Sequence, residues 1–192
     1  MLSDLQTLSA SSIYSLFRPS KCERRVYLNA HGVVAREKSE FEKLIEELGQ
    51  RHEHNHLATF PDHLDLSDGS IEERVLKTHE AVSNGVQVIY QGVLRSQLAP
   101  DGEEIIGIPD FLIADGETYK IRECKLSRHA DEDNHPEILR QVELYGWLFE
   151  ETFHKKPSCL EVYLGDETLK QLEYTVGTKA LETLCHIQRL SS

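Results

Sequence analysis

Apolar residues in the first half of the chain recur at helical spacing. Between residues 38 and 57 they follow one another at intervals of four, three and four residues, as Phe41, Ile45, Leu48 and His52. This spacing predicts one helix with an inward-facing stripe that includes His52. A shorter helix is expected at residues 71–83. Two more short helices are expected over residues 8–28, separated at Pro19, with Ser20 as the cap of the second.

The second half of the chain begins with apolar runs that are typical of strands. Strands are predicted at residues 86–90, 92–98, 104–114 and 118–125. The dipeptide Asp115-Gly116 predicts a hairpin between the last two strands, and Pro100-Asp101-Gly102 predicts an earlier turn. A helix from Pro136 to about Phe153, a strand at 160–164 and a helix at 178–190 complete the chain.

This order of elements predicts the fold class. Adjacent strands joined by hairpins, followed by a helical connection to another strand, form a mixed sheet with helices packed against it. The 192 residues suffice for one core, so we expect a single α/β domain over residues 1–192, with an N-terminal helical segment.

Charge changes the picture of possible partners. The formal net charge is −12, which argues against a broad basic surface that holds nucleic acid by its phosphates. Basic residues gather locally at Lys21, Arg24 and Arg25, where they predict either a small DNA contact or a solvated helix face.

The remaining composition is typical of a cytoplasmic protein. No apolar run approaches the length of a membrane span, and the first residues lack the basic and apolar regions of a secretory signal. The four cysteines are scattered without paired spacing, as expected of reduced thiols.

Candidate chemistry lies on the predicted hairpin. Asp110 interrupts an apolar run from Ile105 to Ile113, where an unpaired charge would be costly. Glu123 and Lys125, on the partner strand, point to one side because strand side chains alternate. Two carboxylates and a backbone carbonyl, such as that of Cys124, would suit Mg²⁺ or Mn²⁺. Lys125 would orient a metal-activated water or stabilise developing charge, and the alternative is a surface salt bridge.

Two more polar residues lie on predicted apolar faces. His52 would either bind a metal, favouring Mn²⁺, or be a core histidine satisfied by its neighbours. Gln141 lies among the apolar residues of the helix that begins at Pro136, and a buried amide needs partners. It would either hold a water or phosphate together with Tyr145, one turn further on, or bond to the backbone.

Four short motifs together resemble a known family. They are Gly49-Gln50-Arg51-His52-Glu53, Gly107-Ile108-Pro109-Asp110, Glu123-Cys124-Lys125 and Gln141-Val142-Glu143-Leu144-Tyr145-Gly146-Trp147. In this order they closely resemble the PD-(D/E)XK nuclease superfamily, in its RecB-like branch, which includes CRISPR-associated exonucleases. The segment from Ser9 to Leu28 also looks like the opening of these proteins.

The resemblance has implications for fold, site and activity. It implies a restriction-endonuclease-like fold, with His52, Asp110 and Glu123 as metal ligands. It makes Lys125 the catalytic lysine and Gln141 with Tyr145 the motif of the following helix. It further implies cleavage of DNA phosphodiesters, often single-stranded and from an end, in repair, recombination or defence, with helicase or CRISPR proteins as partners.

One departure from the family concerns cysteine. Many relatives hold an iron–sulfur cluster with one early and three late cysteines. Cys22 matches the early position, but only Cys159 and Cys185 follow the lysine motif. Four thiolates are the usual requirement, and Cys124 belongs to the catalytic strand. We therefore expect no cluster, with Cys22 as a packing residue.

Two rival functions remain open. His52-Glu53-His54-Asn55-His56 also satisfies the His-Glu-x-x-His pattern of zinc proteases, although it leaves Asp110, Glu123 and Lys125 unexplained. The acidic composition would also suit a non-catalytic DNA-binding or docking module of a helicase-nuclease assembly.

Overall fold

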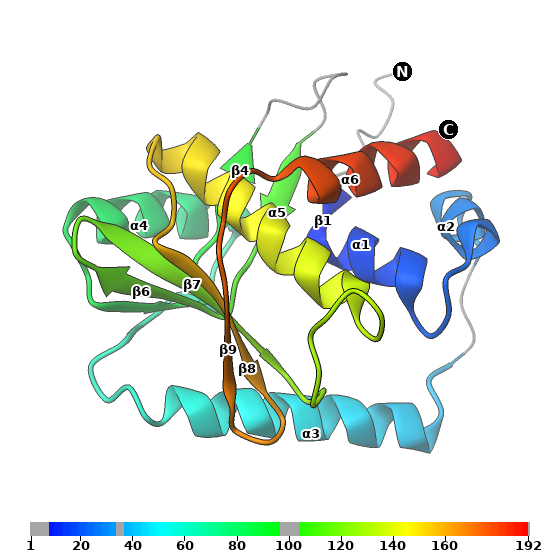
Figure 1. Ribbon diagram of the computed structural model, residues 1–192, viewed down its shortest axis with the longest axis horizontal. Coiled ribbons are helices and arrows are strands. Elements are labelled where there is room, and N and C mark those ends of the chain that lie inside the picture. Colours follow the sequence, from blue (N-terminus) through cyan, green and yellow to red (C-terminus); the bar gives the residue numbers. More distant parts are fainter. Residues whose placement is uncertain (1–7, 34–36, 97–103, 192) are drawn as a thin grey trace.

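The computed structural model describes residues 8–33, 37–96 and 104–191. Helices lie on both sides of mixed sheets, as Figure 1 shows. In chain order the elements are β1 (Leu8–Ser9), α1 (Ala10–Phe17), α2 (Glu23–Ala30), α3 (Glu40–Leu57), β2 (Leu64–Asp65), α4 (Ile71–Ser83), β3 (Val88–Tyr90), β4 (Leu94–Ser96), β5 (Ile105–Gly107), β6 (Phe111–Asp115), β7 (Thr118–Lys125), α5 (Pro136–Phe153), β8 (Cys159–Leu164), β9 (Leu169–Leu172) and α6 (Thr178–Ser191). None of the described helices combines the length and apolar character that crossing a bilayer requires.

Local sequence signals explain where the long helices begin. Ser39 accepts a hydrogen bond from the Glu42 amide while the Glu42 side chain bonds back to the Ser39 amide, so that α3 starts with a capping box. Ser70 starts α4 in the same way. Pro136 occupies the first turn of α5, where its missing amide hydrogen costs nothing. The predicted bounds of α5 are confirmed.

The larger sheet has six strands in the order β2-β3-β6-β7-β8-β9. The predicted hairpin at Asp115-Gly116 is confirmed, because β6 and β7 pair antiparallel with Phe111 opposite Arg122. β7 and β8 are parallel, and α5 connects them across one face. α3 packs against β7 on the other face, so this sheet lies between two long helices, drawn cyan and yellow in Figure 1.

The prediction of a single strand at residues 104–114 is wrong. The segment divides into β5 and β6, which belong to different sheets, since β5 pairs with β1 and β4. The break falls at Ile108-Pro109-Asp110, where proline removes a hydrogen-bond donor from the ladder. Asp110 therefore directly precedes β6 instead of lying inside a strand.

Other expectations differ in smaller ways. Cys22, not Ser20, precedes the first turn of α2. The inward stripe predicted for α3 fails in its first half, where Phe41 is 70% exposed and Ile45 is 44% exposed. Strands β1, β2 and β9 were not predicted, and the turn at Pro100-Asp101-Gly102 lies outside the described residues.

Two glycines near Leu126 differ in the space available for a side chain, and this difference leads to a first prediction. A Cβ on Gly165 would lie 2.2 Å from the Leu126 carbonyl oxygen, whereas one on Gly49 would lie 3.9 Å from Leu126 Cδ1. Gly165→Ala should therefore lower the free energy of unfolding by about 1–3 kcal/mol. Gly49→Ala, in mid-helix, should raise it by about 0.5–1 kcal/mol. Urea denaturation of both variants checks this, and equal stabilities would contradict the packing described here.

Candidate active site

Asp110 and Glu123 face each other where the hairpin opens. The register that pairs Phe111 with Arg122 continues one step further to this pair. Their side chains are nearly buried, at 9% and 4% exposure. The Cys124 amide donates to Asp110 Oδ2 at 2.7 Å, and the Asp110 amide lies 3.4 Å from Glu123 Oε2. The backbone thus holds two carboxylates side by side.

Three further side chains converge on this pair. Lys125 Nζ and Gln141 Nε2 both donate to Glu123 Oε1, at 2.7 and 2.8 Å. Gln141 Nε2 also contacts the Tyr145 hydroxyl at 2.8 Å, one turn along α5. The structure therefore brings together Asp110, Glu123, Lys125, Gln141 and Tyr145, all of which sequence analysis had selected.

Burial and like charge dominate the electrostatics of the site. Burial, followed by the Glu123 and Glu53 carboxylates, raises the pKa of Asp110 well above its ordinary value. Burial also raises the pKa of Glu123, against the opposing effect of Lys125. Burial alone would lower the pKa of Lys125, but Glu123 and Asp110 outweigh it and raise that pKa to about 12. The site thus has an excess of negative charge, and a bound cation would reduce the repulsion between its carboxylates.

Glu53 on α3 is a neighbour of the site to which the sequence assigned a role only in the zinc-protease alternative. Its carboxylate raises the pKa of both Asp110 and Glu123. Its Oε1 accepts hydrogen bonds from the Tyr90 hydroxyl at 2.7 Å and the Gln91 amide at 3.0 Å. Three carboxylates, from α3, β7 and the segment before β6, therefore act on one region. Its place in the Gly49-to-Glu53 motif was the available signal.

His52, the adjacent residue, makes its contacts with another strand. Its ring stacks on Tyr163 of β8, with centroids 4.9 Å apart and planes inclined by 8°. Its Nε2 lies 3.4 Å from the Tyr163 carbonyl oxygen. The helix thus turns Glu53, and not His52, toward the hydrogen-bonding groups at the end of β3.

His56 completes a buried polar network behind the sheet. Its Nε2 lies 2.9 Å from Arg122 Nη1, and Arg122 in turn binds the 1%-exposed Glu161. Burial, then the Arg122 charge, lowers the pKa of His56 to about 4. His56 Nε2 thus faces a guanidinium, and its ring stacks on Tyr163, as the ring of His52 also does, so the two histidines of the zinc-protease alternative are engaged with other side chains.

The predicted basic cluster has mainly internal contacts. Arg25 donates to the carbonyl oxygens of Ser15 and Ser20, at distances between 2.6 and 2.9 Å, so it ties α2 to the end of α1. Lys21 lies over the Phe17 ring, and Arg24 is exposed. All four cysteines are free, and Cys22 is half-buried.

The donor set fits a hard cation that keeps much of its water. No group of three or more histidine, cysteine or acidic side chains among the described residues could by itself enclose a metal ion. Mg²⁺, however, usually binds through one or two carboxylates together with water or phosphate oxygens. Gln141 Oε1 is buried and has no hydrogen-bond partner, so it is available to a metal-bound water. Asp110, Glu123 and this oxygen meet that requirement.

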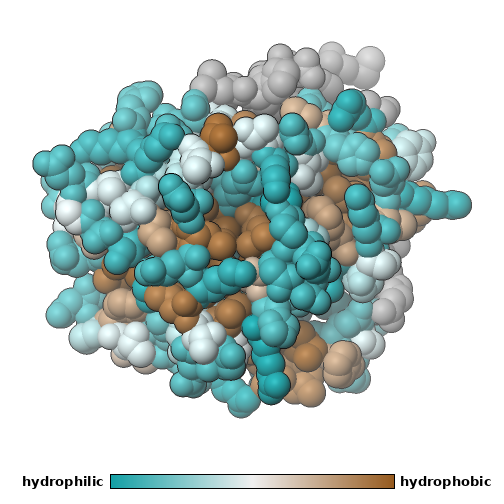
Figure 2. Space-filling model, viewed as in Figure 1, coloured by the Kyte–Doolittle hydropathy of each residue, from teal (hydrophilic) through white to brown (hydrophobic). Residues whose placement is uncertain are grey.

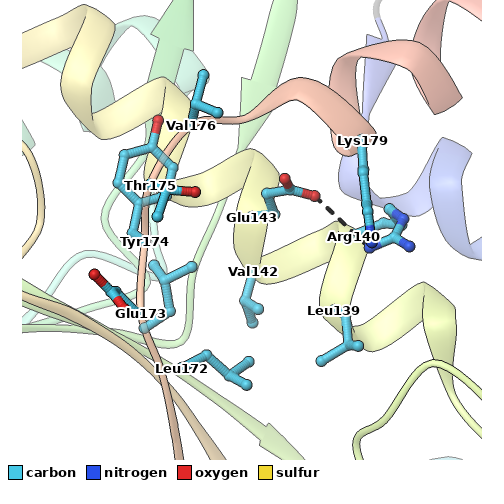
Figure 3. A pocket seen from close by; sticks show the side chains of 11 residues that line it. Leu139, Arg140, Val142, Glu143, Leu172, Glu173, Tyr174, Thr175, Val176 and Lys179 are labelled. Atoms are coloured by element: carbon cyan, nitrogen blue, oxygen red, sulfur yellow. Dashed lines mark ion pairs between the residues drawn. The ribbon is translucent and has the colours of Figure 1, made fainter.

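A separate small cavity lies beside the first half of α5, where Leu139, Arg140, Val142 and Glu143 contribute to its lining. Figure 3 shows the side chains around it, including the ion pair between Arg140 and Glu143, with N and O 3.8 Å apart. Its volume is about 260 Å³, and Asp110, Glu123 and Lys125 are not among the residues that line it. The candidate chemistry therefore does not belong to this cavity.

Comparison with known proteins supports the fold. No protein-family model matches the chain, and no curated protein matches its sequence. A crystal structure from Eubacterium rectale, named "Putative exonuclease", matches with a TM-score of 0.56 and 14% identity, over 98% of this chain and 82% of that one. A structure named SSO0001 gives a TM-score of 0.40 and 16% identity, over 77% and 86% of the two chains. The first match confirms the predicted α/β fold of mixed sheets flanked by helices, which is restriction-endonuclease-like.

Proposed function

We propose that this chain is a divalent-metal-dependent DNA nuclease of the RecB-like PD-(D/E)XK type. The observation that carries the proposal is the adjacency of two buried carboxylates, with a lysine and an amide bound to the same Glu123 oxygen. The likeness to the Eubacterium rectale structure, whose name includes the word exonuclease, supports a nuclease. The resemblance of the four motifs supports DNA with a free or single-stranded end as substrate.

Each side chain of the site has a distinct role in this proposal. Asp110 and Glu123 hold Mg²⁺ or Mn²⁺, with the Cys124 carbonyl as a third oxygen ligand. The ion supplies a water of lowered pKa and shields phosphate charge. Gln141 fixes the orientation of Glu123 from α5, and Tyr145 fixes Gln141. Lys125, charged because its pKa is raised to about 12, stabilises the negative charge that develops on the phosphate.

The proposal is tested with labelled single- and double-stranded DNA in Mg²⁺ or Mn²⁺. Wild type should cleave, and Lys125→Ala should lose about 10²- to 10³-fold in rate, as when one electrostatic donor is removed. Lys120→Ala is the matched control, since Lys120 lies on the same strand but pairs with the exposed Asp115. Cleavage that persists in Lys125→Ala would contradict the mechanism. No cleavage of any substrate with either metal would favour the docking module.

Replacing Glu53 and replacing His52, its neighbour on α3, should have different effects on the affinity for Mn²⁺. Glu53→Gln removes a charge that acts on both carboxylates, so we expect it to weaken the apparent affinity for Mn²⁺ by about tenfold or more, as for outer residues of metal sites. His52→Ala, whose ring contacts Tyr163, should change that affinity little. A Mn²⁺ titration of DNA cleavage compares the two variants, and the reverse order would favour His52 as a metal ligand.

A further inference from the structure

A second cleft lies beside the candidate site, between α1 and the first half of α3. Its volume is about 680 Å³. It is lined by residues of both helices and of the segments next to them: Tyr14, Arg18, Pro19, Lys38, Phe41, Glu42, Ile45 and Glu46. The second half of α3 packs on the body of the protein, where Gly49 approaches Leu126. The first half stands away from it, as Figure 1 shows.

Exposed rings and aliphatic groups are the main feature of this cleft. Tyr14 is 46% exposed, Phe41 is 70% exposed and Ile45 is 44% exposed. In Figure 2, brown apolar atoms interrupt the teal surface along the lower edge of the molecule, over α3. Large apolar side chains left in water at one place mark an interaction surface.

The cleft adjoins the carboxylate site through Tyr14. Lys125 Nζ lies 6.0 Å from the centre of the Tyr14 ring while it also binds Glu123 at 2.7 Å. Tyr14 therefore lines the cleft and adjoins the proposed catalytic lysine. A polymer whose phosphate reached Lys125 would have its neighbouring units within this cleft.

The charges around the cleft are mostly compensated. Lys38 binds both carboxylate oxygens of Glu46, at 2.9 and 2.7 Å. Arg18 binds the buried Glu137 at 2.6 Å. Phosphate attraction is thus weak here, in keeping with a chain of net charge −12. Base stacking on aromatic rings does not need a basic surface.

We infer that the cleft between α1 and α3 binds an unpaired nucleic-acid strand, with bases stacked on Tyr14 and Phe41. This inference rests on the proposed nuclease function, and it assigns the surface that selects single strands. A duplex keeps its base faces stacked on one another, so it does not offer them to these rings. Phe41 and Tyr14 are positioning residues, because they hold the strand while the carboxylates act on it.

The test is strand binding without cleavage. In an Asp110→Asn background, fluorescence anisotropy compares labelled oligothymidine, an abasic strand of equal length and a duplex. Replacing one ring by alanine should weaken oligothymidine binding about fivefold to 100-fold, and should leave binding of the abasic strand almost unchanged. Tyr14→Phe and Phe41→Tyr keep the ring face and should restore affinity. Affinity should fall only gently with salt, at a logarithmic slope of about −1 to −2.

Matched controls and contrary outcomes are available. Tyr27→Ala and Leu76→Ala remove side chains that are 48% and 64% exposed elsewhere, and should leave binding unchanged. Equal loss of abasic and thymidine binding in the alanine variants would overturn stacking, as would equal affinity for duplex. Self-association abolished by Phe41→Ala would instead assign the surface to a second copy of the chain. Because binding is read without cleavage, an inactive wild type that still stacks the strand would refute the nuclease and not this surface.

Discussion

Replacing Asp110 by asparagine should greatly slow metal-dependent cleavage and at the same time stabilise the metal-free protein. Asparagine can still accept the hydrogen bond from the Cys124 amide. It removes one of two adjacent buried charges, and with it a metal ligand. We expect the cleavage rate to fall about 10²- to 10⁴-fold, since a catalytic ion supplies several kcal/mol. Each kcal/mol of stability gained would raise the melting temperature by about 2–4 °C.

The sign of the stability effect follows from the pKa of Asp110. Burial, and then Glu123, raise that pKa in the folded protein, so the folded state favours the protonated acid. The stabilisation that protonation gives is complete below the unfolded pKa of about 3.9, and it is lost as pH rises through the folded pKa. The melting-temperature difference between Asp110→Asn and wild type, measured in EDTA, should therefore be larger at pH 8 than at pH 4.

Asp115→Asn is the matched control for this experiment. Asp115 ends β6, the strand that Asp110 precedes, but its side chain is 43% exposed and lies 3.7 Å from the ammonium of Lys120. Its replacement should change neither activity nor stability measurably. If Asp110→Asn lowered the melting temperature as well as the cleavage rate, Asp110 would have a structural role and not the functional role proposed here.

Replacing Arg122 by alanine should cause the largest loss of stability. Arg122 Nε and Nη2 donate to Glu161 Oε2 at 2.8 and 2.6 Å, and Glu161 is 1% exposed. Without Arg122, the hydrogen bond that this carboxylate keeps within the described residues comes from the side-chain amide of Gln171, at 3.1 Å. Leaving a buried charge unpaired costs about 3–5 kcal/mol. We therefore expect the melting temperature to fall by about 6–20 °C.

A double variant separates the lost pair from lost packing. Arg122→Met combined with Glu161→Met removes both charges and should recover most of the stability, because apolar replacement of a buried pair is often neutral. Lys120→Ala, which breaks an exposed pair on the same strand, should cost less than about 1 kcal/mol. If Arg122→Ala were no more costly than Lys120→Ala, the buried network would not contribute as its geometry indicates.

The sequence predicted the elements whose signals are local. Pro136 and the apolar periodicity after it define α5, and Asp115-Gly116 defines the hairpin. The prediction of one strand over residues 104–114 failed because it overlooked the break at Pro109 and because β5 pairs with β1, which lies far away in the chain. Short strands that pair only with distant partners carry little signal of their own.

The site was predicted in part, for a similar reason. Strand alternation and the polar residue in the apolar face of α5 were enough to select Glu123, Lys125 and Gln141. The face of α3 that packs on the protein could not be predicted from the apolar spacing, because Phe41 and Ile45, which define that spacing, are exposed. The face that packs in the second half of α3 includes Gly49 near Leu126 and the buried Leu57. Glu53 lies midway between these two, at helical spacing of four.

The most direct test of the central proposal is calorimetric titration of the purified protein with Mn²⁺. Asp110 and Glu123 should together bind the ion in wild type, and both Asp110→Asn and Glu123→Gln should abolish that binding, while Asp115→Asn should retain it. The same preparations should cleave DNA in the same order. Wild-type Mn²⁺ affinity in Asp110→Asn and Glu123→Gln, or no binding by wild type, would contradict a metal site between these two carboxylates.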